Sequence, residues 1–143
     1  MILVDVMVLV YAFHEGAPDH DRYRDWFDEM VASPEPYGVS ELALSGFVRI
    51  ATHPRIFDPP APVDRAIEFA DAVRGQPNAV IIAPGPRHWD IFTGLCTSAE
   101  AKGNLVPDAY HAALALESGS EWITTDRDFS RFPGVRWRHP LAS

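Results

Sequence analysis

The chain has 143 residues, of which 47% are hydrophobic and 22% charged, a balance that gives an ordinary globular domain with a core of its own. Its single cysteine, Cys96, excludes an intramolecular disulfide and an all-cysteine zinc site, and we expect a reducing compartment such as the cytoplasm. The net charge of −8 excludes a protein that wraps nucleic acid with a broadly basic surface, but not an acidic metal site, where a bound cation reverses the local charge.

The first half of the chain predicts two strands and three helices. The N-terminus lacks the basic region of a signal peptide and the long apolar stretch of a membrane span. Apolar residues 2–4 predict a buried strand that ends at Asp5. A second short strand is predicted at residues 37–39. Apolar residues at helical spacing predict helices over residues 20–31, from Ser40 to about Thr52, and through residues 67–73 to near Gly75. Asp19 and Ser40 are available as N-caps of the first two helices.

The second half of the chain continues this alternation. Residues 79–83, with the sequence Ala-Val-Ile-Ile-Ala, predict the clearest buried strand. Two helices follow, one from Trp89 to Ala99 closed by Gly103, and one that starts at Pro107 and is closed by Gly119. The last two strands are predicted at residues 122–125 and, at a sheet edge, 135–137. Strands that alternate with helices predict one α/β domain over residues 1–143 with a mostly parallel sheet.

Acidic side chains stand where the predicted strands end and where the following helices begin. Asp5 and Asp126 directly follow strands, and Asp128 lies two residues beyond Asp126. Glu41 and Asp108 open helices. In a parallel sheet, strand ends and the helix starts that follow them lie at one edge, where α/β proteins form their sites. We therefore expect these carboxylates to converge.

A cluster of carboxylates has a specific chemistry. Like charges at close range repel one another unless some are protonated or a cation binds between them. Magnesium and manganese prefer hard oxygen ligands, and such a site activates water and stabilises the charge on a phosphate under attack. The cluster therefore predicts metal-assisted phosphodiester hydrolysis that needs no serine or cysteine nucleophile.

Each acid also has a purely structural interpretation. Acidic residues are favoured at helix starts, where they meet the positive end of the helix dipole, and this alone accounts for Glu41 and Asp108. Asp126 and Asp128 fit the cap of a short turn. Asp5 is harder to explain in this way, because a carboxylate among apolar strand residues is costly to bury without a partner.

Four short motifs run in order along nearly the whole chain. They are residues 1–5 (Met-Ile-Leu-Val-Asp), 40–44 (Ser-Glu-Leu-Ala-Leu), 106–109 (Val-Pro-Asp-Ala) and 124–129 (Thr-Thr-Asp-Arg-Asp-Phe). Together they resemble the PIN-domain family, specifically the VapC toxins of bacterial toxin–antitoxin pairs. The resemblance implies a three-layer α/β/α fold and an endoribonuclease that depends on Mg²⁺ or Mn²⁺. The partners it implies are an RNA substrate, a VapB-type antitoxin and a second copy of the chain in a homodimer.

The resemblance also implies roles for individual residues. Asp5, Glu41, Asp108 and Asp126 match the acidic catalytic quartet, with Asp5, Asp108 and Asp126 as metal ligands and Asp128 in an auxiliary role.

One position departs from the family pattern. After the first aspartate the family usually has Ala-Asn-Val, whereas this chain has Val6, Met7 and Val8. An asparagine at the second position can orient a neighbouring carboxylate, whereas a thioether is only a weak acceptor. Two hypotheses follow: an active enzyme in which Met7 packs in the core, or a catalytically impaired PIN scaffold that acts mainly by binding its antitoxin.

Several other residues have two interpretations each. His111 shares a helix face with Asp108 and is interpreted as a partly exposed histidine, since hard cations favour oxygen ligands; contact with substrate or metal is the alternative. Basic residues near the end of one helix and in the tail suit either RNA phosphates or solvent: Arg49, His53, Arg55, Arg136, Arg138 and His139. The four tryptophans are expected in the core or a dimer interface rather than stacked on bases.

Two other enzyme or signalling classes fit less well. A phosphatase that forms an aspartyl-phosphate commonly has a second aspartate two residues after the first, where this chain has Met7. A phospho-receiver domain needs a lysine late in the chain, and the only lysine here is Lys102.

Overall fold

Five short parallel strands form the centre of the computed structural model, which describes residues 1–142. The strands are β1 (Ile2–Val4), β2 (Tyr37–Val39), β3 (Ala79–Ile81), β4 (Glu121–Ile123) and β5 (Trp137–Arg138). Their order across the sheet is β3-β2-β1-β4-β5, and within residues 1–142 every strand pairing is parallel. The first strand therefore lies in the middle of the sheet, with β2 on one side and β4, from near the end of the chain, on the other.

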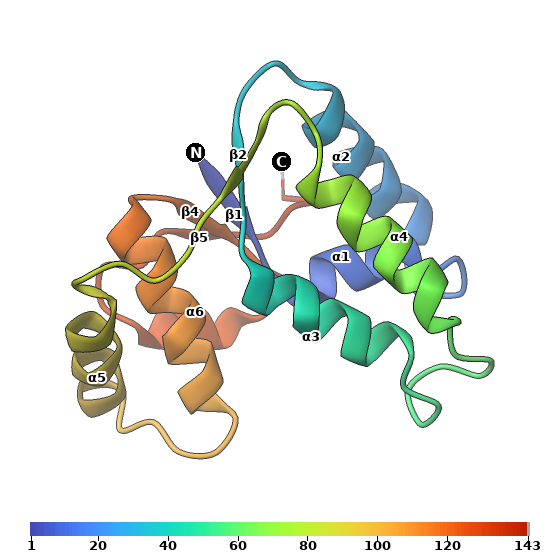
Figure 1. Ribbon diagram of the computed structural model, residues 1–143. Coiled ribbons are helices and arrows are strands. Elements are labelled where there is room, and N and C mark those ends of the chain that lie inside the picture. The colour runs from blue at the N-terminus through green and yellow to red at the C-terminus, as the bar shows by residue number, and fades with distance from the viewer. Residues whose placement is uncertain (143) are drawn as a thin grey trace.

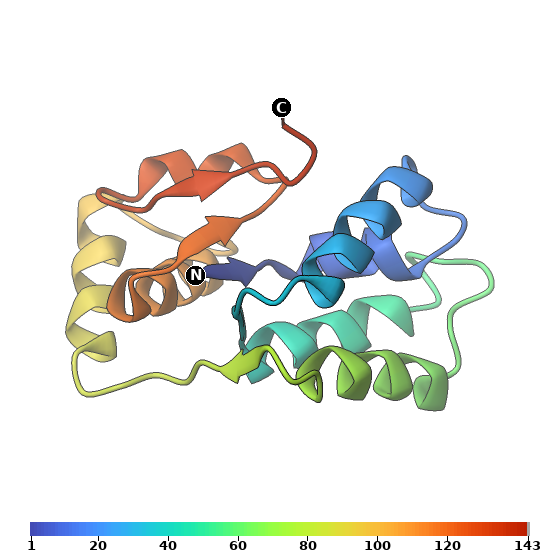
Figure 2. The same ribbon diagram turned by 90° about the horizontal axis from the view of Figure 1, so that it is seen from above.

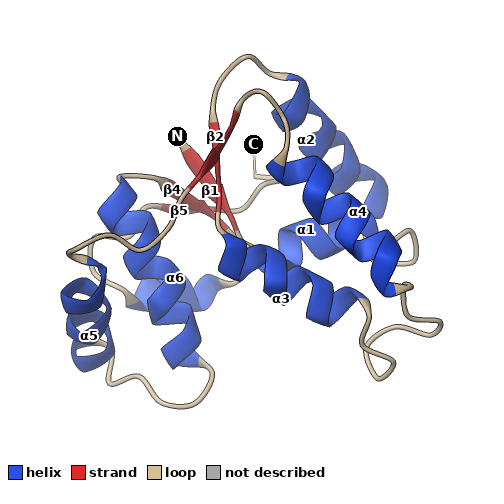
Figure 3. Cartoon of the chain, viewed as in Figure 1, coloured by secondary structure: helices blue, strands red, loops and turns tan. Residues whose placement is uncertain are grey.

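Helices cover both faces of this sheet (Figures 1 and 3). They are α1 (Val6–Phe13), α2 (His20–Ala32), α3 (Glu41–Ala51), α4 (Val63–Arg74), α5 (His88–Ser98), α6 (Leu105–Ser118) and the short 3₁₀-helix η1 (Arg127–Arg131). Seen from above, α1 to α4 gather on one side of the strands, and α5, α6 and η1 on the other (Figure 2). The arrangement confirms the predicted three-layer α/β/α fold with a parallel sheet.

Each face of the sheet buries its own hydrophobic cluster. One cluster packs α1 to α4 around Val4, Phe27 and Phe47, and the other packs α5, α6 and η1 around Leu3 and Trp122. Leu3 and Val4 are neighbours in β1 but belong to different clusters, because successive side chains of a strand point to opposite faces. The central strand thus anchors both layers.

The predicted helix ends are partly confirmed. Ser40 caps α3 by accepting a hydrogen bond from the backbone N–H of Ala43, and Gly119 ends α6 with φ 68°, a left-handed conformation that suits glycine. Asp19 precedes α2, but its side chain forms no capping hydrogen bond. Helix α6 begins at Leu105, two residues before the expected start at Pro107. Proline is tolerated there because the first-turn N–H groups have no partner within the helix.

The strand expected to be most buried is an edge strand, so that prediction was wrong. β3 lies at the end of the sheet, and Val80 and Ile81 are 40% and 39% exposed. A continuous apolar run is the pattern of a strand covered on both faces. Here it instead leaves apolar side chains on the surface of the molecule, where Trp89 of α5 is also exposed, at 63%.

No helix in the described part of the chain combines the length and the hydrophobicity needed to cross a lipid bilayer.

Candidate active site

The central position of β1 brings the first acidic residue next to the last ones. In the parallel pair β1 and β4, Val4 lies opposite Ile123, and the backbone N–H of Asp5 donates to the carbonyl of Ile123 at 2.9 Å. The residues that follow the two strands, Asp5 and Thr124, therefore emerge side by side at the carboxyl edge of the sheet. This is the edge at which α/β proteins form their sites.

Asp5 is held in place by two hydrogen bonds. One carboxylate oxygen, Oδ1, accepts from the backbone N–H of Val6 at 2.7 Å, which makes Asp5 the N-cap of α1. The other oxygen, Oδ2, accepts from the hydroxyl of Thr124 at 2.7 Å. These bonds supply the partners that a carboxylate among apolar strand residues needs.

Thr124 also links Asp5 to Asp126. Its Oγ1 accepts a hydrogen bond from the backbone N–H of Asp126 at 3.0 Å, and its side chain is fully buried. Asp126 in turn caps η1, with Oδ1 accepting from the backbone N–H of Asp128 at 2.8 Å. The capping role expected for Asp126 as an alternative is thus real, and it orients the carboxylate without removing it from the site.

Asp108 reaches the same site from the first turn of α6. Burial, which is the largest cause, and then the negative charges of Asp126, Asp5 and Asp128 together raise its pKa to about 6. Burial also raises the pKa of Asp5, and the charge of Asp126 raises it as well. The two hydrogen bonds to Asp5 act in the opposite direction and lower its pKa. Asp126 is therefore close enough to Asp5 and Asp108 to oppose the ionisation of both.

These three aspartates open into one cavity of about 460 Å³. Its other walls come from the start of α1, from α3 and from the first turns of α6: Val6, Met7, Leu42, Ser45, Gly46, Arg49, Ile50, Asn104, Pro107, His111 and Thr125. Asp128 lies outside, with an exposed side chain 3.9 Å from the Nε of Arg131. Among the described residues, Arg49 is the only arginine or lysine of the lining.

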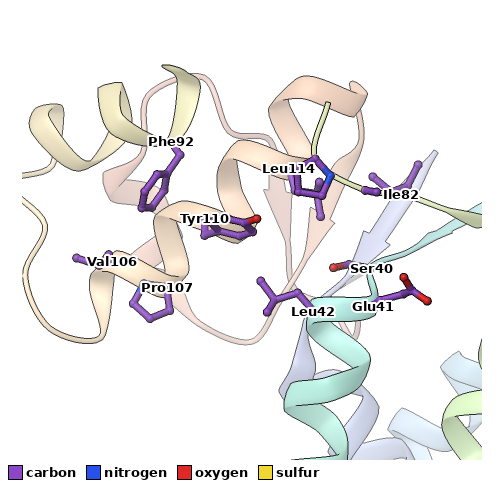
Figure 4. Close-up of a pocket in the computed structure, with 11 residues that line it drawn as sticks. Ser40, Glu41, Leu42, Ile82, Phe92, Val106, Pro107, Tyr110 and Leu114 are labelled. Carbon is purple, nitrogen blue, oxygen red and sulfur yellow. The ribbon is translucent and has the colours of Figure 1, made fainter. Parts of the chain in front are cut away.

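Glu41 is not brought into this cavity. Its side chain is 64% exposed, and its Oε2 pairs with the Nε of Arg74 at 3.1 Å. It lines a neighbouring apolar cavity of about 380 Å³, in which its carboxylate points away from Pro107 and Tyr110 (Figure 4). Leu42 and Pro107 line both cavities and lie between Glu41 and the aspartates.

The donor set fits a hydrated divalent cation better than a cation enclosed by protein. Within residues 1–142, no three side chains of His, Cys, Asp or Glu are grouped closely enough to hold an ion together. Mg²⁺ is commonly held by one or two carboxylates, with water and substrate phosphates as its remaining ligands. The mutual repulsion of Asp5, Asp108 and Asp126, all oxygen donors, is what such a cation would relieve.

Two of the residues weighed in the sequence have other surroundings than expected. His111 was expected to be partly exposed, but it is 9% exposed and lines the acidic cavity. Met7 both packs against the α1–α4 cluster and lines the cavity. Thr124 was missed as a site residue. A usable signal was present, because a threonine hydroxyl commonly bonds the backbone two residues further on, and that residue is Asp126.

Comparison with known proteins identifies the family of the chain. The PIN domain model matches residues 2–135. Ribonuclease VapC43 of Mycobacterium tuberculosis is 40% identical over 141 residues, which cover 99% of this chain and 96% of that protein. Ribonuclease VapC25 of the same species is 41% identical over 140 residues, covering 98% and 99% of the two chains.

Solved structures share the fold at low identity. A VapBC2 structure from Rickettsia felis, bound to a promoter DNA fragment, has a TM-score of 0.70 at 16% identity and covers 97% of this chain and 98% of its own. The sarcin-ricin-loop-cleaving toxin VapC20 of M. tuberculosis has a TM-score of 0.66 at 18% identity, covering 95% and 99%. With the sequence relatives at 40% identity, these findings show that the chain belongs to the PIN-domain family, as a VapC-type member.

Proposed function

We propose that the chain is a metal-dependent endoribonuclease, the toxin of a VapBC pair, and that it hydrolyses RNA phosphodiesters with water. The observation that carries this proposal is the convergence of Asp5, Asp108 and Asp126 in one open cavity, where the charge of Asp126 opposes the ionisation of Asp5 and Asp108. The relatives at about 40% identity are named ribonucleases, which supports RNA as the substrate class.

In this proposal Asp5, Asp108 and Asp126 surround Mg²⁺ or Mn²⁺, with one or two of them as direct ligands and the others bound through water. A cation bound there would activate water and neutralise charge on the phosphate. The protein supplies orientation: the Val6 N–H and the Thr124 hydroxyl fix both oxygens of Asp5, and the turn at Asp128 fixes Asp126. Arg49, exposed at the cavity, is placed to bind a phosphate of the same RNA.

The partners belong to the same proposal. An antitoxin would block the cavity by offering an arginine to the carboxylates, because bidentate arginine–carboxylate pairs are strong and directional. Toxin–antitoxin complexes are among the solved structures that share this fold. The exposed apolar side chains of Val80, Ile81 and Trp89 suit an interface with a second copy of the chain. An antitoxin complex that leaves the cavity open to solvent would contradict the blocking role.

The alternative function is a catalytically impaired PIN scaffold that acts by binding its antitoxin. The observation in its favour is that Met7 lines the cavity at the position where the family usually has an orienting asparagine.

The decisive experiment is RNA cleavage by the purified protein with Mg²⁺ or Mn²⁺. Cleavage should be abolished by EDTA and by Asp108→Ala. Asp90→Ala is the matched control, because Asp90 lies in the first turn of α5 as Asp108 does in α6, but at the surface away from the cavity. Cleavage that persists in EDTA, or that Asp90→Ala removes as fully as Asp108→Ala, would refute the proposed site.

The same assay decides the role of Glu41. In the structure its carboxylate pairs with Arg74 outside the cavity, so a role in catalysis requires that this pair opens. Cleavage by Glu41→Gln at the wild-type rate would remove Glu41 from the catalytic set, and loss of cleavage would place it there.

A further inference from the structure

His111 has surroundings that its place in the core does not explain. It lies on α6 three residues after Asp108, so both side chains share a helix face, and both line the acidic cavity. The side chain is 9% exposed. Its Nδ1 is buried and has no hydrogen-bond partner among residues 1–142, which leaves Nε2 as the ring nitrogen available to the cavity.

The plane of the imidazole is set by Trp122. The two rings stack with centroids 5.4 Å apart and planes 24° from parallel, and Trp122 itself is fully buried against Phe129. A flat, rigid neighbour of this kind restricts rotation of the histidine ring. The edge of the imidazole that carries Nε2 is thus held at the cavity wall.

Burial determines which nitrogen carries the proton. Burial lowers the pKa of His111 to about 4, so the ring is neutral at pH 7 and has one N–H and one lone pair. Buried N–H groups without an acceptor are rarer in proteins than buried acceptors without a donor. The unpartnered Nδ1 is therefore the nitrogen without the proton, and Nε2–H is a donor.

Within residues 1–142 the cavity has one lysine or arginine to receive the negative charge of RNA. Three of its lining residues are carboxylates, and the one cationic residue, Arg49, comes from α3. A phosphate drawn to a cation at the aspartates would meet Asp108 and His111 on the same face of α6. A neutral N–H donor suits a phosphate oxygen there, because it donates a hydrogen bond without repelling the cation.

We propose that His111 is a substrate-binding residue whose Nε2–H donates a hydrogen bond to a phosphate oxygen of RNA bound over Asp5, Asp108 and Asp126. Trp122 is its positioning residue, through the stacking of the two rings. The inference rests on the proposed ribonuclease function and adds to it a contact that needs no metal ligation by the histidine.

The test measures RNA binding in an Asp108→Asn background that stops cleavage, by the fluorescence anisotropy of short labelled RNAs of mixed sequence with Mg²⁺ present. His111→Phe keeps the flat ring and the stacking on Trp122 but removes both nitrogens. His111→Gln replaces the ring by an amide whose N–H reaches about as far as Nε2. Trp122→Phe tests the positioning role, because it disturbs the stacking without removing a donor from the cavity, and it should weaken RNA binding less than His111→Phe does. His88→Phe replaces another buried histidine, which lies outside the cavity; it is the control and should bind RNA as the parent protein does.

Loss of one hydrogen bond to a charged group should weaken RNA binding by about tenfold in His111→Phe, with most of the affinity restored in His111→Gln. The loss should be equal for RNAs of different sequence, because phosphate contacts carry no sequence information. Circular dichroism shows which variants are folded, and RNA affinities are compared only among the folded variants.

Three results would overturn the inference: full affinity in His111→Phe, affinity as low in His111→Gln as in His111→Phe, or a loss confined to one RNA sequence. If the Asp108→Asn protein binds no RNA and the wild type cuts none, the ribonuclease proposal fails and the inference fails with it. Cleavage by the wild type with full affinity in His111→Phe refutes the inference alone.

Discussion

At the level of single residues, one hydroxyl organises two of the aspartates. A threonine hydroxyl has one hydrogen, and that of Thr124 is donated to Asp5 while a lone pair accepts from the backbone N–H of Asp126. The direction of both bonds is thereby determined. Because Thr124 is fully buried, water cannot replace it if the hydroxyl is removed.

Thr124→Val should impair the site while Thr124→Ser preserves it. Valine keeps the shape but leaves Asp5 without one of its two donors, and the loss of such an outer hydrogen bond typically costs about 10–100-fold in metal affinity or activity. The measurements are cleavage rate and the Mn²⁺ concentration that gives half-maximal activity. Equal activity in the valine and serine variants would show that the hydroxyl does not orient the aspartates.

Met7 is the second residue that tests the site at this scale. It lies on the first turn of α1, beside Asp5, and lines the cavity. If the thioether weakens the site, Met7→Asn should raise cleavage or metal affinity by about 10–100-fold. Met7→Leu, which keeps an apolar side chain of similar size, is the control and should match the wild type. No gain in Met7→Asn would leave Met7 as a packing residue and remove the reason to regard this chain as impaired.

At the level of elements, a side chain of α6 anchors the loop that leads from β3 to α5. Glu117 accepts backbone N–H bonds from Gly85 at 2.6 Å and from Arg87 at 2.9 Å. A Cβ on Gly85 would lie 2.7 Å from Oε2 of Glu117, so the close approach depends on glycine. This contact joins α6, which carries Asp108 and His111, to the segment before α5.

The anchor makes a pH-dependent contribution to stability. The Gly85 N–H is the main cause that holds the pKa of Glu117 below its ordinary value of 4.5, with Arg87 N–H and the charges of His88 and Arg87 acting in the same direction. A carboxyl whose pKa is lower in the folded than in the unfolded state stabilises the fold above the unfolded value. That contribution is lost as the pH falls through the lower, folded value.

Glu117→Gln should therefore lower the thermal unfolding midpoint at pH 7 by a small amount. At a pH below the folded pKa of Glu117, the variant and the wild type should unfold at nearly the same temperature. Thermal melts followed by circular dichroism at pH 7, 5 and 3 check this, and the difference between the two proteins removes the effect of other carboxyls. A midpoint difference that stays constant over this pH range would show that the charge of Glu117 does not contribute.

At the level of the whole molecule, the net charge of −8 limits how RNA is bound. The acidic cavity has Arg49 as its one lysine or arginine within the described residues, so binding should release few counterions from the RNA. A protein that makes many phosphate contacts instead shows a steep dependence of affinity on salt.

We expect the logarithm of RNA affinity to fall with the logarithm of salt concentration with a slope of about −1, as for one or two neutralised phosphates on a single strand. Anisotropy titrations over a series of KCl concentrations at constant Mg²⁺ give this slope. Arg49→Ala should flatten it, and Arg65→Ala, an exposed arginine on α4 outside the cavity, should not. A slope of about −4 or steeper would indicate a basic surface that binds RNA elsewhere.

The sequence by itself determined the order of strands and helices except for α1, which was not predicted. Periodicity and caps such as Ser40 and Gly119 act between residues close in the chain. It also identified Asp5, Asp108 and Asp126 as residues that should meet, since strand ends of a parallel sheet share one edge. The structure brings these three together, and their catalytic role stays a prediction.

Only the tertiary structure decided the surroundings of the other residues. The exposure of β3 follows from its place at the sheet edge, and the exclusion of Glu41 follows from its pairing with Arg74, 33 residues away along the chain. The hydrogen bond of Thr124 to Asp5 spans 119 residues, and His111 meets the cavity because Trp122 packs behind it. Such contacts depend on which strands are neighbours and on which way each side chain points. The local sequence pattern determines neither the strand neighbours nor the side-chain directions, because both are set by the packing of distant segments.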